Sequence, residues 1–209
     1  MSKMTCTFCN KFSKRSHVPR EWFDEILLET PHFFVVPGLG ALADGYSLVV
    51  SRTHEVSMAA LPESQLSELR DIVSELRSNL STAFEPLVLF EHGPACEKGG
   101  GGACIVHAHM HILPTRLNLA DIPVDDNSFA PIPDLTHLRR FANLDYVFLE
   151  LQDGSAFVGQ GKTRSSQWFR RIVAERIGVP DEWDYAVFQH PARIKCTIAG
   201  YKTCVCKAK

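Results

Sequence analysis

Three histidines stand at alternating positions in residues 107–111, with alanine and methionine between them. Because successive side chains of a strand point to opposite faces, a strand over residues 105–113 would set the three imidazoles on one face, about 6.5–7 Å apart. The residues between them are apolar and would face a hydrophobic core. Imidazole is costly to bury without polar partners, so packing alone does not account for three of them. The segment therefore predicts a half-buried strand whose polar face, made of His107, His109 and His111, carries chemistry.

Aligned imidazoles suit two kinds of chemistry. All three could bind one metal ion, or one of them could act as a nucleophile. Four glycines at 99–102 lie directly upstream, and backbone N–H groups without side chains in the way are what an anionic phosphate needs. A flexible hairpin is the other interpretation of these glycines. Glycines and histidines together favour nucleophilic attack on phosphorus, since a neutral imidazole is a competent nucleophile at pH 7.

Charge and composition exclude some classes of partner. The chain has 209 residues, a formal net charge of −2 and 45% hydrophobic residues, as expected of a globular protein. This charge gives no general attraction to nucleic acid or membrane, so local groups must hold an anionic substrate. No apolar run approaches the roughly 18 residues that span a bilayer. The polar first ten residues and the odd count of seven cysteines predict a cytoplasmic protein without a signal peptide.

Apolar periodicity predicts an α+β fold whose strands pair mainly as antiparallel neighbours. Strands are expected at 25–30, 32–37, 46–51, 87–91 and 105–113, with a hairpin of 146–151 and 155–158 and one more strand within 194–209. Helices are expected at about 62–80, 137–142 and 166–177, and a long loop at 118–134. Ser165 or Ser166 is the expected N-cap of the last helix, and Gly178 its expected end.

A Cys-x-x-Cys pair, Cys6 and Cys9, lies near the start of the sequence. Such a pair suits a redox centre or tetrahedral zinc, and two free thiols are the plain alternative. A redox centre of this kind requires a strand followed by a helix, as in thioredoxin, and this segment lacks that pattern. Zinc needs two further ligands, and the candidates are His17, His32, His54 and His107. Cys204 and Cys206 form another close pair, better interpreted as tail thiols than as a second metal site.

Together these residues resemble the histidine triad superfamily. Its pattern, His-φ-His-φ-His-φ-φ, is matched by residues 107–113 and followed by Pro114, and residues 43–54 resemble the family segment that ends in a basic residue, one further residue and His. The resemblance covers about residues 6–115. It implies an antiparallel sheet of about five strands with a long packed helix. The chain would then divide into a core with a zinc knuckle, 1–117, and a C-terminal extension, 118–209.

The resemblance also implies a zinc site. A zinc-bearing branch of the family has ligands at the positions of Cys6, Cys9, His54 and the first triad residue, His107. Four protein ligands leave no open position, so this zinc would be structural.

By the same resemblance, His109 is the nucleophile. It would attack the α-phosphorus of a nucleotide derivative and form a covalent nucleotidyl-imidazole, which water or another acceptor resolves. The backbone carbonyl of His107 would hold its other nitrogen, and His111 would bind the phosphate or help protonate the leaving group. Backbone N–H groups near Gly102 and Cys104 would stabilise the charge on the pentavalent phosphorus.

The sequence departs from the family pattern at some contacts. Gly38 stands where phosphoramidate-cleaving members carry an acidic residue for the ribose hydroxyls, and Cys104 replaces a hydroxyl that often contacts phosphate. An amide-bearing residue of several members falls near Glu91 and His92, either of which is a candidate acid–base partner. The expected phosphate- and nucleotide-binding residues are Gly102, Cys104, Glu91, His92, Phe34 and Pro37.

Several activities remain open at this level. The leaving group can be an amine, a nucleotide or a carboxylate; phosphoramidates are the first choice and dinucleoside polyphosphates of the Ap3A or Ap4A type the alternative. A nucleotide-binding module without turnover and a metallohydrolase using all three histidines are further alternatives. The polar, basic stretch at 160–167 can bind phosphate at a helix N-terminus, although a capped surface helix is the favoured interpretation. Small family members commonly form homodimers.

Overall fold

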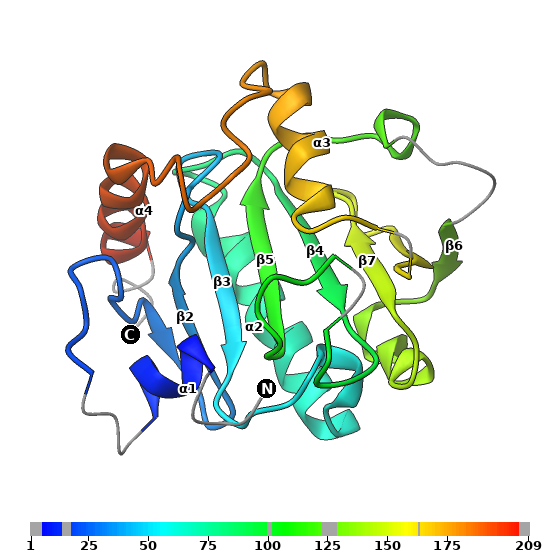
Figure 1. The fold of residues 1–209 in the computed structure, drawn as a ribbon. Coiled ribbons are helices and arrows are strands. Elements are labelled where there is room, and N and C mark those ends of the chain that lie inside the picture. Colours follow the sequence, from blue (N-terminus) through cyan, green and yellow to red (C-terminus); the bar gives the residue numbers. More distant parts are fainter. Residues whose placement is uncertain (1–5, 14–17, 100–101, 123–128, 163, 205–209) are drawn as a thin grey trace.

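The structure, a computed structural model, describes residues 6–13, 18–99, 102–122, 129–162 and 164–204. Within this part of the chain the strands form one eight-stranded sheet, in the order β1-β2-β3-β5-β4-β7-β8-β6, and every neighbouring pair is antiparallel (Figure 1). The strands are β1 Leu28–Glu29, β2 Phe33–Pro37, β3 Ser47–Ser51, β4 Leu87–Gly93, β5 His109–Pro114, β6 Phe129–Ile132, β7 Tyr146–Glu150 and β8 Ala156–Gln160. The helices are α1 Thr7–Phe12, α2 Glu63–Leu80, α3 Trp168–Arg176 and α4 Pro191–Cys204, with short 3₁₀ helices at Met58–Ala60, Leu119–Asp121 and Leu135–Phe141.

The sheet is wider than the five strands expected, because the second half of the chain continues it. β7 pairs with β4, β8 with β7, and β6 with β8, so three further strands lie beyond β4. The hairpin predicted for 146–151 and 155–158 is confirmed as β7 and β8. The loop predicted for 118–134 was wrong in part, since it contains β6; residues 123–128 lie outside the described part.

Helices cover both faces of this sheet. α2 buries the six apolar residues whose spacing predicted it. They share one cluster with Ala108, Met110 and Ile112, which confirms that the apolar face of the histidine segment lies on the core. α3 covers the opposite face, where Phe169 packs with Phe90 from β4. The histidine face of β5 therefore looks toward the side of the sheet that carries α1 and α3 (Figure 1).

The tail expected to be a strand is the helix α4. Its buried residues Ile194, Thr197 and Tyr201 are spaced by three and four, which is the helical period. Pro191 is the first helical residue, where its missing N–H costs nothing. Cys204 ends this helix, while Cys206 lies outside the described residues.

The start of α3 also differs from the expectation. Its N-cap is Gln167, with φ of 58° and no capping hydrogen bond from its side chain, rather than Ser165 or Ser166. The Ser166 hydroxyl instead lies 2.9 Å from the Cys104 thiol. Gly178 follows the helix with φ of 81°, a left-handed conformation that glycine adopts without strain, so the predicted end is confirmed.

Candidate functional site

The three histidines do not form one row, because the strand begins only at His109. The residue before it, Ala108, is held differently: its N–H donates to the carbonyl of Glu55, and its carbonyl accepts from the N–H of Ser51. His107 therefore turns toward the N-terminal segment, whereas His109 and His111 share one face, with ring centroids 5.0 Å apart. The expected evenly spaced row is thus replaced by two sites that meet at His107.

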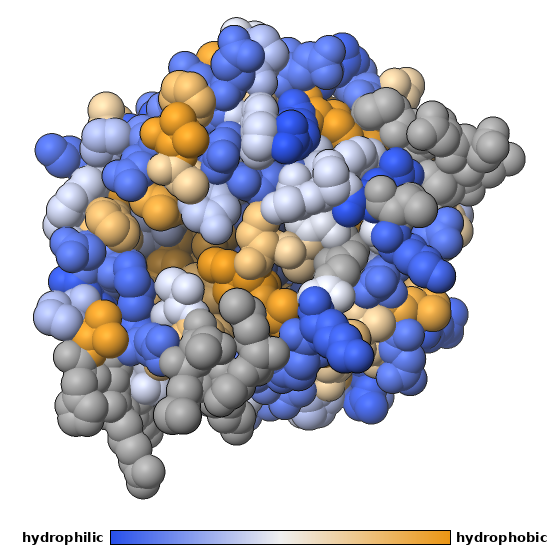
Figure 2. Space-filling view, viewed as in Figure 1, coloured by the Kyte–Doolittle hydropathy of each residue, from blue (hydrophilic) through white to orange (hydrophobic). Residues whose placement is uncertain are grey.

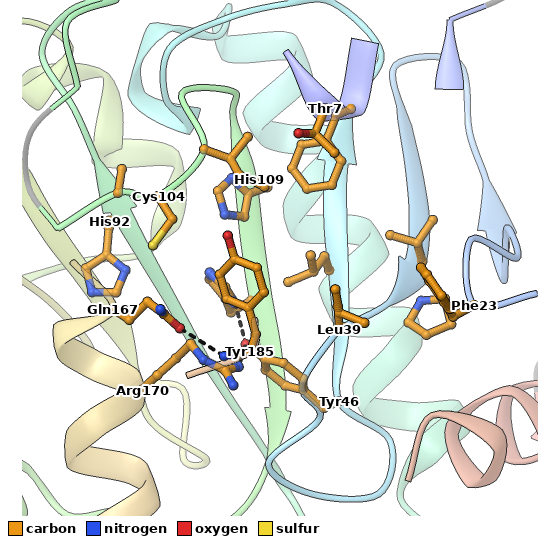
Figure 3. Close-up of a pocket in the computed structure, with 18 of the residues that line it drawn as sticks. Thr7, Phe23, Leu39, Tyr46, His92, Cys104, His109, Gln167, Arg170 and Tyr185 are labelled. Carbon is orange, nitrogen blue, oxygen red and sulfur yellow. Dashed lines mark hydrogen bonds between the residues drawn. The ribbon is translucent and has the colours of Figure 1, made fainter. Parts of the chain in front are cut away.

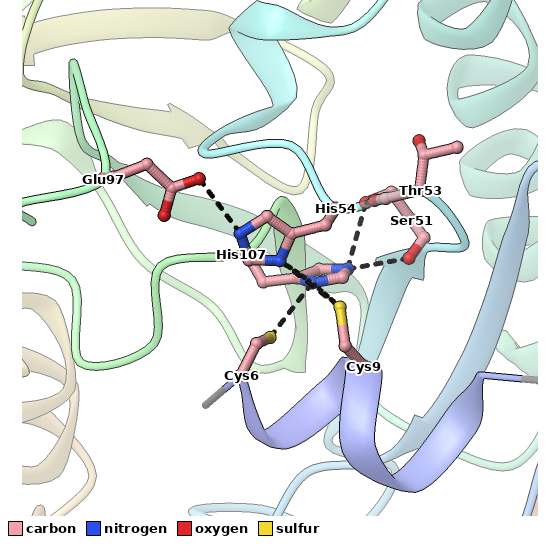
Figure 4. Close-up of polar contacts among 7 residues, drawn as sticks. All are labelled: Cys6, Cys9, Ser51, Thr53, His54, Glu97 and His107. Atoms are coloured by element: carbon pink, nitrogen blue, oxygen red, sulfur yellow. Dashed lines mark hydrogen bonds and ion pairs between the residues drawn. The ribbon is translucent and has the colours of Figure 1, made fainter. Parts of the chain in front are cut away.

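The first site is a cluster of the four predicted metal ligands (Figure 4). Cys6 lies just before α1, and Cys9 lies on it. The sulfur of Cys6 is 3.3 Å from Nδ1 of His107, and the sulfur of Cys9 is 3.3 Å from Nδ1 of His54. Nδ1 of His107 lies 3.3 Å from Nδ1 of His54 and 3.6 Å from the sulfur of Cys9. All four ligand atoms lie within 4.8 Å of one another.

These spacings fit tetrahedral zinc. With Zn–N of about 2.0–2.1 Å and Zn–S of about 2.3 Å, neighbouring ligand atoms of a tetrahedron lie about 3.3–3.8 Å apart. The outer nitrogens are also engaged: Nε2 of His107 lies 2.8 Å from the carbonyl oxygen of Ser51, and Nε2 of His54 lies 3.2 Å from a carboxylate oxygen of Glu97. Because both acceptors draw a proton to Nε2, each Nδ1 keeps its lone pair for a metal. Burial lowers the pKa of His107 to about 4, which keeps this ring neutral.

The second site is a pocket of about 300 Å³ on the same side of the sheet, lined by His109 and His111. Figure 3 shows His109 among the side chains that surround it. Figure 2 shows apolar side chains gathered around a hollow on this side of the molecule. The apolar lining comes from Phe8, Phe12, Phe23, Val36, Pro37, Leu39, Leu48 and Ile105. A mostly apolar pocket with a few polar groups at one end is the usual form of a small-molecule site.

The tautomer of His109 follows from its hydrogen bond. Its Nδ1 lies 2.6 Å from the carbonyl oxygen of His107, and a carbonyl can only accept, so Nδ1 carries the proton. Nε2 is therefore left with its lone pair. Burial lowers the pKa of His109, which favours this neutral form. Phe8 of α1 packs against both rings, with centroids 5.5 Å from His107 and 5.4 Å from His109.

The tautomer of His111 follows from a chain that starts at Arg170. This guanidinium donates to the Tyr46 hydroxyl at 3.0 Å, and that hydroxyl lies 2.6 Å from Nδ1 of His111. A guanidinium only donates, so the tyrosine oxygen accepts from it, and among the described residues Nδ1 of His111 is the acceptor left for the tyrosine proton. His111 therefore carries its proton on Nε2. Its ring is stacked on Phe90, with centroids 4.2 Å apart, and burial holds its pKa well below the usual value.

Arg170 is a buried cation at this pocket. Only 3% of it is exposed, and it donates to two backbone carbonyls, those of Gly40 at 2.7 Å and Trp183 at 2.8 Å, besides Tyr46. Among the described residues no carboxylate forms an ion pair with it. A buried charge without a direct ion-pair partner is costly, which makes this end of the pocket suited to an anion.

Not all the nucleotide-binding residues expected from the sequence reach the pocket. Pro37, His92, Gly102 and Cys104 line it. Phe34 does not; it packs against Phe12 beneath α1, with centroids 4.7 Å apart. Glu91 lies on the opposite face of β4, because side chains alternate along the strand. There it accepts from the N–H of Met58 at 2.7 Å and from the hydroxyl of Tyr146. The structure thus places it in the core.

Gly38 also lines the pocket, and its lack of a side chain has a structural reason. A Cβ at this position would lie 2.4 Å from the ring of Tyr46, far inside contact distance. The carboxylate expected there from family members is thus excluded by Tyr46. Among the described residues that line the pocket, the acidic one is Asp24, whose carboxylate accepts hydrogen bonds from Lys11 at 2.8 and 2.9 Å.

Sequence reasoning missed several residues of this site. They are Tyr46, Asp24, Arg170 and Tyr185, whereas Gln167 belongs to the stretch 160–167 that was considered for phosphate binding. Helix α3 was expected, yet no local pattern distinguishes Arg170 from its exposed neighbour Arg171, since arginines on a helix are usually solvated.

Comparisons with known proteins give only distant similarities. No family model matches the sequence, and neither does any curated protein. Among solved structures, a Hit-like protein involved in cell-cycle regulation from Bartonella henselae is similar with a TM-score of 0.38 and 15% identity, over 46% of this chain and 70% of that one. A Zn-bound histidine triad family protein from Mycobacterium smegmatis has a TM-score of 0.35 and 16% identity, over 56% of this chain and 80% of that one.

A third solved structure is yeast Ap4A phosphorylase in complex with AMP, with a TM-score of 0.42 and 17% identity, over 67% of this chain and 61% of that one. With TM-scores below 0.5, these similarities establish neither a family nor an activity for this chain. In the described part of the chain, no helix combines the length and apolar character needed to cross a membrane.

Proposed function

We propose that this chain is a histidine triad protein that cleaves nucleotide conjugates at the α-phosphorus, with His109 as the nucleophile. The observation that carries this proposal is the hydrogen bond of 2.6 Å between Nδ1 of His109 and the carbonyl of His107. It leaves the lone pair of Nε2 available in a pocket that also holds the buried guanidinium of Arg170. A nucleophile with a fixed tautomer in the same pocket as a buried guanidinium suits attack on a phosphate ester or amide.

The reaction begins when Nε2 of His109 attacks the α-phosphorus and the bond from phosphorus to the leaving group breaks. His111 gives its Nε2 proton to the leaving nitrogen or oxygen. The Tyr46 hydroxyl, 2.6 Å from Nδ1 of His111, replaces that proton. Burial raises the pKa of Tyr46, and the Arg170 guanidinium that donates to its oxygen offsets part of the cost of the transient tyrosinate. Water then attacks the nucleotidyl-imidazole, releases the nucleotide and returns the proton through His111 to Tyr46.

The substrate we propose first is a nucleoside phosphoramidate or an aminoacyl nucleotide, with a dinucleoside polyphosphate as the alternative. The apolar end of the pocket, around Phe8 and Leu39, suits a nucleobase. Gly38 has no carboxylate, but Asp24 brings one to the pocket wall, where Lys11 holds it in place. We assign it the sugar hydroxyls, since a carboxylate accepts hydrogen bonds from such groups.

The proposed zinc is structural. Cys6, Cys9, His54 and His107 fit the ion and supply all four ligands, so a metal here would hold α1 against the triad segment and supply no open position to substrate. Phe8 lies between the two cysteines in the sequence and packs on the ring of His109. A metal that fixes α1 would therefore also fix the side chain that packs against the nucleophile.

The direct test compares the wild type with His109→Ala and His109→Asn on an adenosine phosphoramidate and on a dinucleoside polyphosphate. Both variants should lose turnover by at least about a thousandfold. His32→Asn is the matched control, because His32 is a surface residue paired with Glu68. Unchanged turnover in the His109 variants would refute the assignment of His109 as the nucleophile.

Two other outcomes identify the alternative functions. Turnover that is lost on chelation and restored by metal, in protein that remains folded, would indicate a metallohydrolase. Binding of AMP without turnover of any conjugate would indicate a nucleotide-binding module. A cytoplasmic location, a homodimer, and the division of the chain into a core of residues 1–117 and an extension 118–209 stay predictions.

A further inference from the structure

His92 is a pocket residue whose ring is fixed from behind. It lies on β4, is 7% exposed, and lines the pocket with His109 and His111. Its Nε2 lies 3.2 Å from the backbone N–H of Phe169 in the first turn of α3, and that N–H donates to it. A backbone amide cannot accept at nitrogen, so Nε2 of His92 must hold a lone pair. In a neutral ring the proton then stands on Nδ1.

The orientation of this ring aims the proton at the substrate. Figure 3 shows His92 beside Cys104, with its second nitrogen turned toward the pocket. In the described part of the chain no hydrogen-bond partner accepts from this Nδ1. The ring of His111 lies 6.4 Å away at 82°, so the two imidazoles face the same space from different directions.

Neighbouring backbone holds the His92 ring in this orientation. Gly102 has φ of 83°, and a Cβ there would lie 2.8 Å from the carbonyl oxygen of Ser165 and 3.0 Å from the ring of His92. The carbonyl of Gly102 accepts from the N–H of Gln167, at the start of α3. Gly102, the start of α3 and the ring of His92 are therefore packed as one unit.

We propose that His92 is a catalytic residue that donates an Nδ1–H hydrogen bond to a non-bridging oxygen of the α-phosphate. This proposal rests on the proposed function and refines it. Together with His111, it gives the α-phosphate two neutral imidazole donors. Phe169 of α3 bonds to His92 directly, and the next residue, Arg170, holds His111 through Tyr46.

The two donors differ in what they can do with their proton. His111 is backed by a hydroxyl that can replace a proton at Nδ1. His92 is backed by an amide that cannot, so loss of its Nδ1 proton would leave an imidazolate. It can therefore hold a developing negative charge but not act as the general acid. Burial lowers the pKa of His92 to about 3, with His109 and Arg170 as smaller causes, which agrees with a neutral ring at working pH.

The first test is the tautomer itself, which does not depend on turnover. In full-length protein labelled with ¹⁵N-histidine at pH 7, long-range ¹H–¹⁵N spectra should show His92 protonated at Nδ1 and unprotonated at Nε2. The resonance is assigned by its loss in His92→Gln. Adding AMP should shift the Nδ1 signal of His92. A proton on Nε2, or an Nδ1 signal unmoved by saturating AMP, would overturn the proposal.

The second test separates donation from capping. Asn places an N–H at the position of Nδ1 but cannot reach Phe169, whereas Gln reaches Phe169 but has no donor at Nδ1. We expect His92→Asn to keep turnover within about tenfold and His92→Gln to lose about a hundredfold or more, the usual effect of removing one such donor. Wild-type turnover in His92→Gln would overturn the proposal, and so would equal losses in both folded variants.

A failure of the proposed function is distinguishable from a failure of this inference. If neither the wild type nor any variant turns over a conjugate, the affinity for AMP takes the place of turnover. His92→Gln should then weaken AMP binding by about tenfold in titration calorimetry, with His92→Asn close to wild type. Equal affinities in the two variants would refute the phosphate contact.

Discussion

Replacing Glu91 with Gln tests the placement of this carboxyl in the core rather than in the pocket. Burial raises the pKa of Glu91 from 4.5 to about 7, against the opposing effect of hydrogen bonds from Tyr146 and the N–H of Met58. The unfolded chain releases this proton near pH 4.5, whereas the folded protein keeps it until about pH 7. Between these values the unfolded state binds fewer protons, so the free energy of unfolding falls as pH rises.

The size of this effect follows from the shift. About 2.5 pH units at about 1.4 kcal/mol each give a cost of about 3 kcal/mol, fully present above pH 7 and absent below pH 4.5. Gln is neutral at every pH, and its amide oxygen can still accept from Met58. The stability of Glu91→Gln relative to wild type should therefore improve by about 2–3 kcal/mol between pH 5 and pH 8.

Urea unfolding followed by tryptophan fluorescence at pH 5, 6, 7 and 8 measures this difference. Turnover at pH 7 should stay within about threefold of wild type, because Glu91 lies on the face of β4 away from the pocket. A stability difference that is the same at pH 5 and pH 8 would refute the reasoning on burial. A loss of turnover of a hundredfold or more without a stability change would restore Glu91 as an acid–base partner.

Three further predictions concern the sites themselves. Arg170→Met should lower kcat/KM by about a hundredfold or more, and Arg171→Gln, its exposed neighbour, should leave it within twofold; equal effects would contradict the anion-binding role. The purified protein should contain about one zinc per chain by atomic absorption, and Cys9→Ser should lose that zinc and lower Tm; wild-type metal content in this variant would contradict the site. Gly38→Asp should destabilise the protein and lower turnover, because the new Cβ would collide with Tyr46; improved affinity for ribonucleotides would contradict this.

Local periodicity was enough to predict much of the scaffold. The spacing of apolar residues predicted α2, the hairpin of β7 and β8, and the apolar face of the histidine segment, because each pattern repeats within a few residues. The four candidate metal ligands also came from the sequence, through two short motifs and a resemblance to a family. The structure brings these four together within 4.8 Å.

Other local patterns were misleading. The tail was expected as a strand, although Ile194, Thr197 and Tyr201 have helical spacing, and it forms α4. The strand that carries the histidines starts later than the pattern suggested, because Ala108 makes its hydrogen bonds with Glu55 and Ser51. That shift takes His107 out of the row, and only contacts with distant segments could have revealed it.

The sequence by itself determined which residue types carry the chemistry: alternating histidines, a cysteine pair and a glycine loop. Only the tertiary structure decided how their protons are arranged. The bond from Arg170 to Tyr46 joins residues 124 positions apart, and the bond from Phe169 to His92 joins residues 77 apart. A tautomer depends on whichever donor or acceptor packing brings to the other ring nitrogen, and no local pattern in a chain specifies that partner.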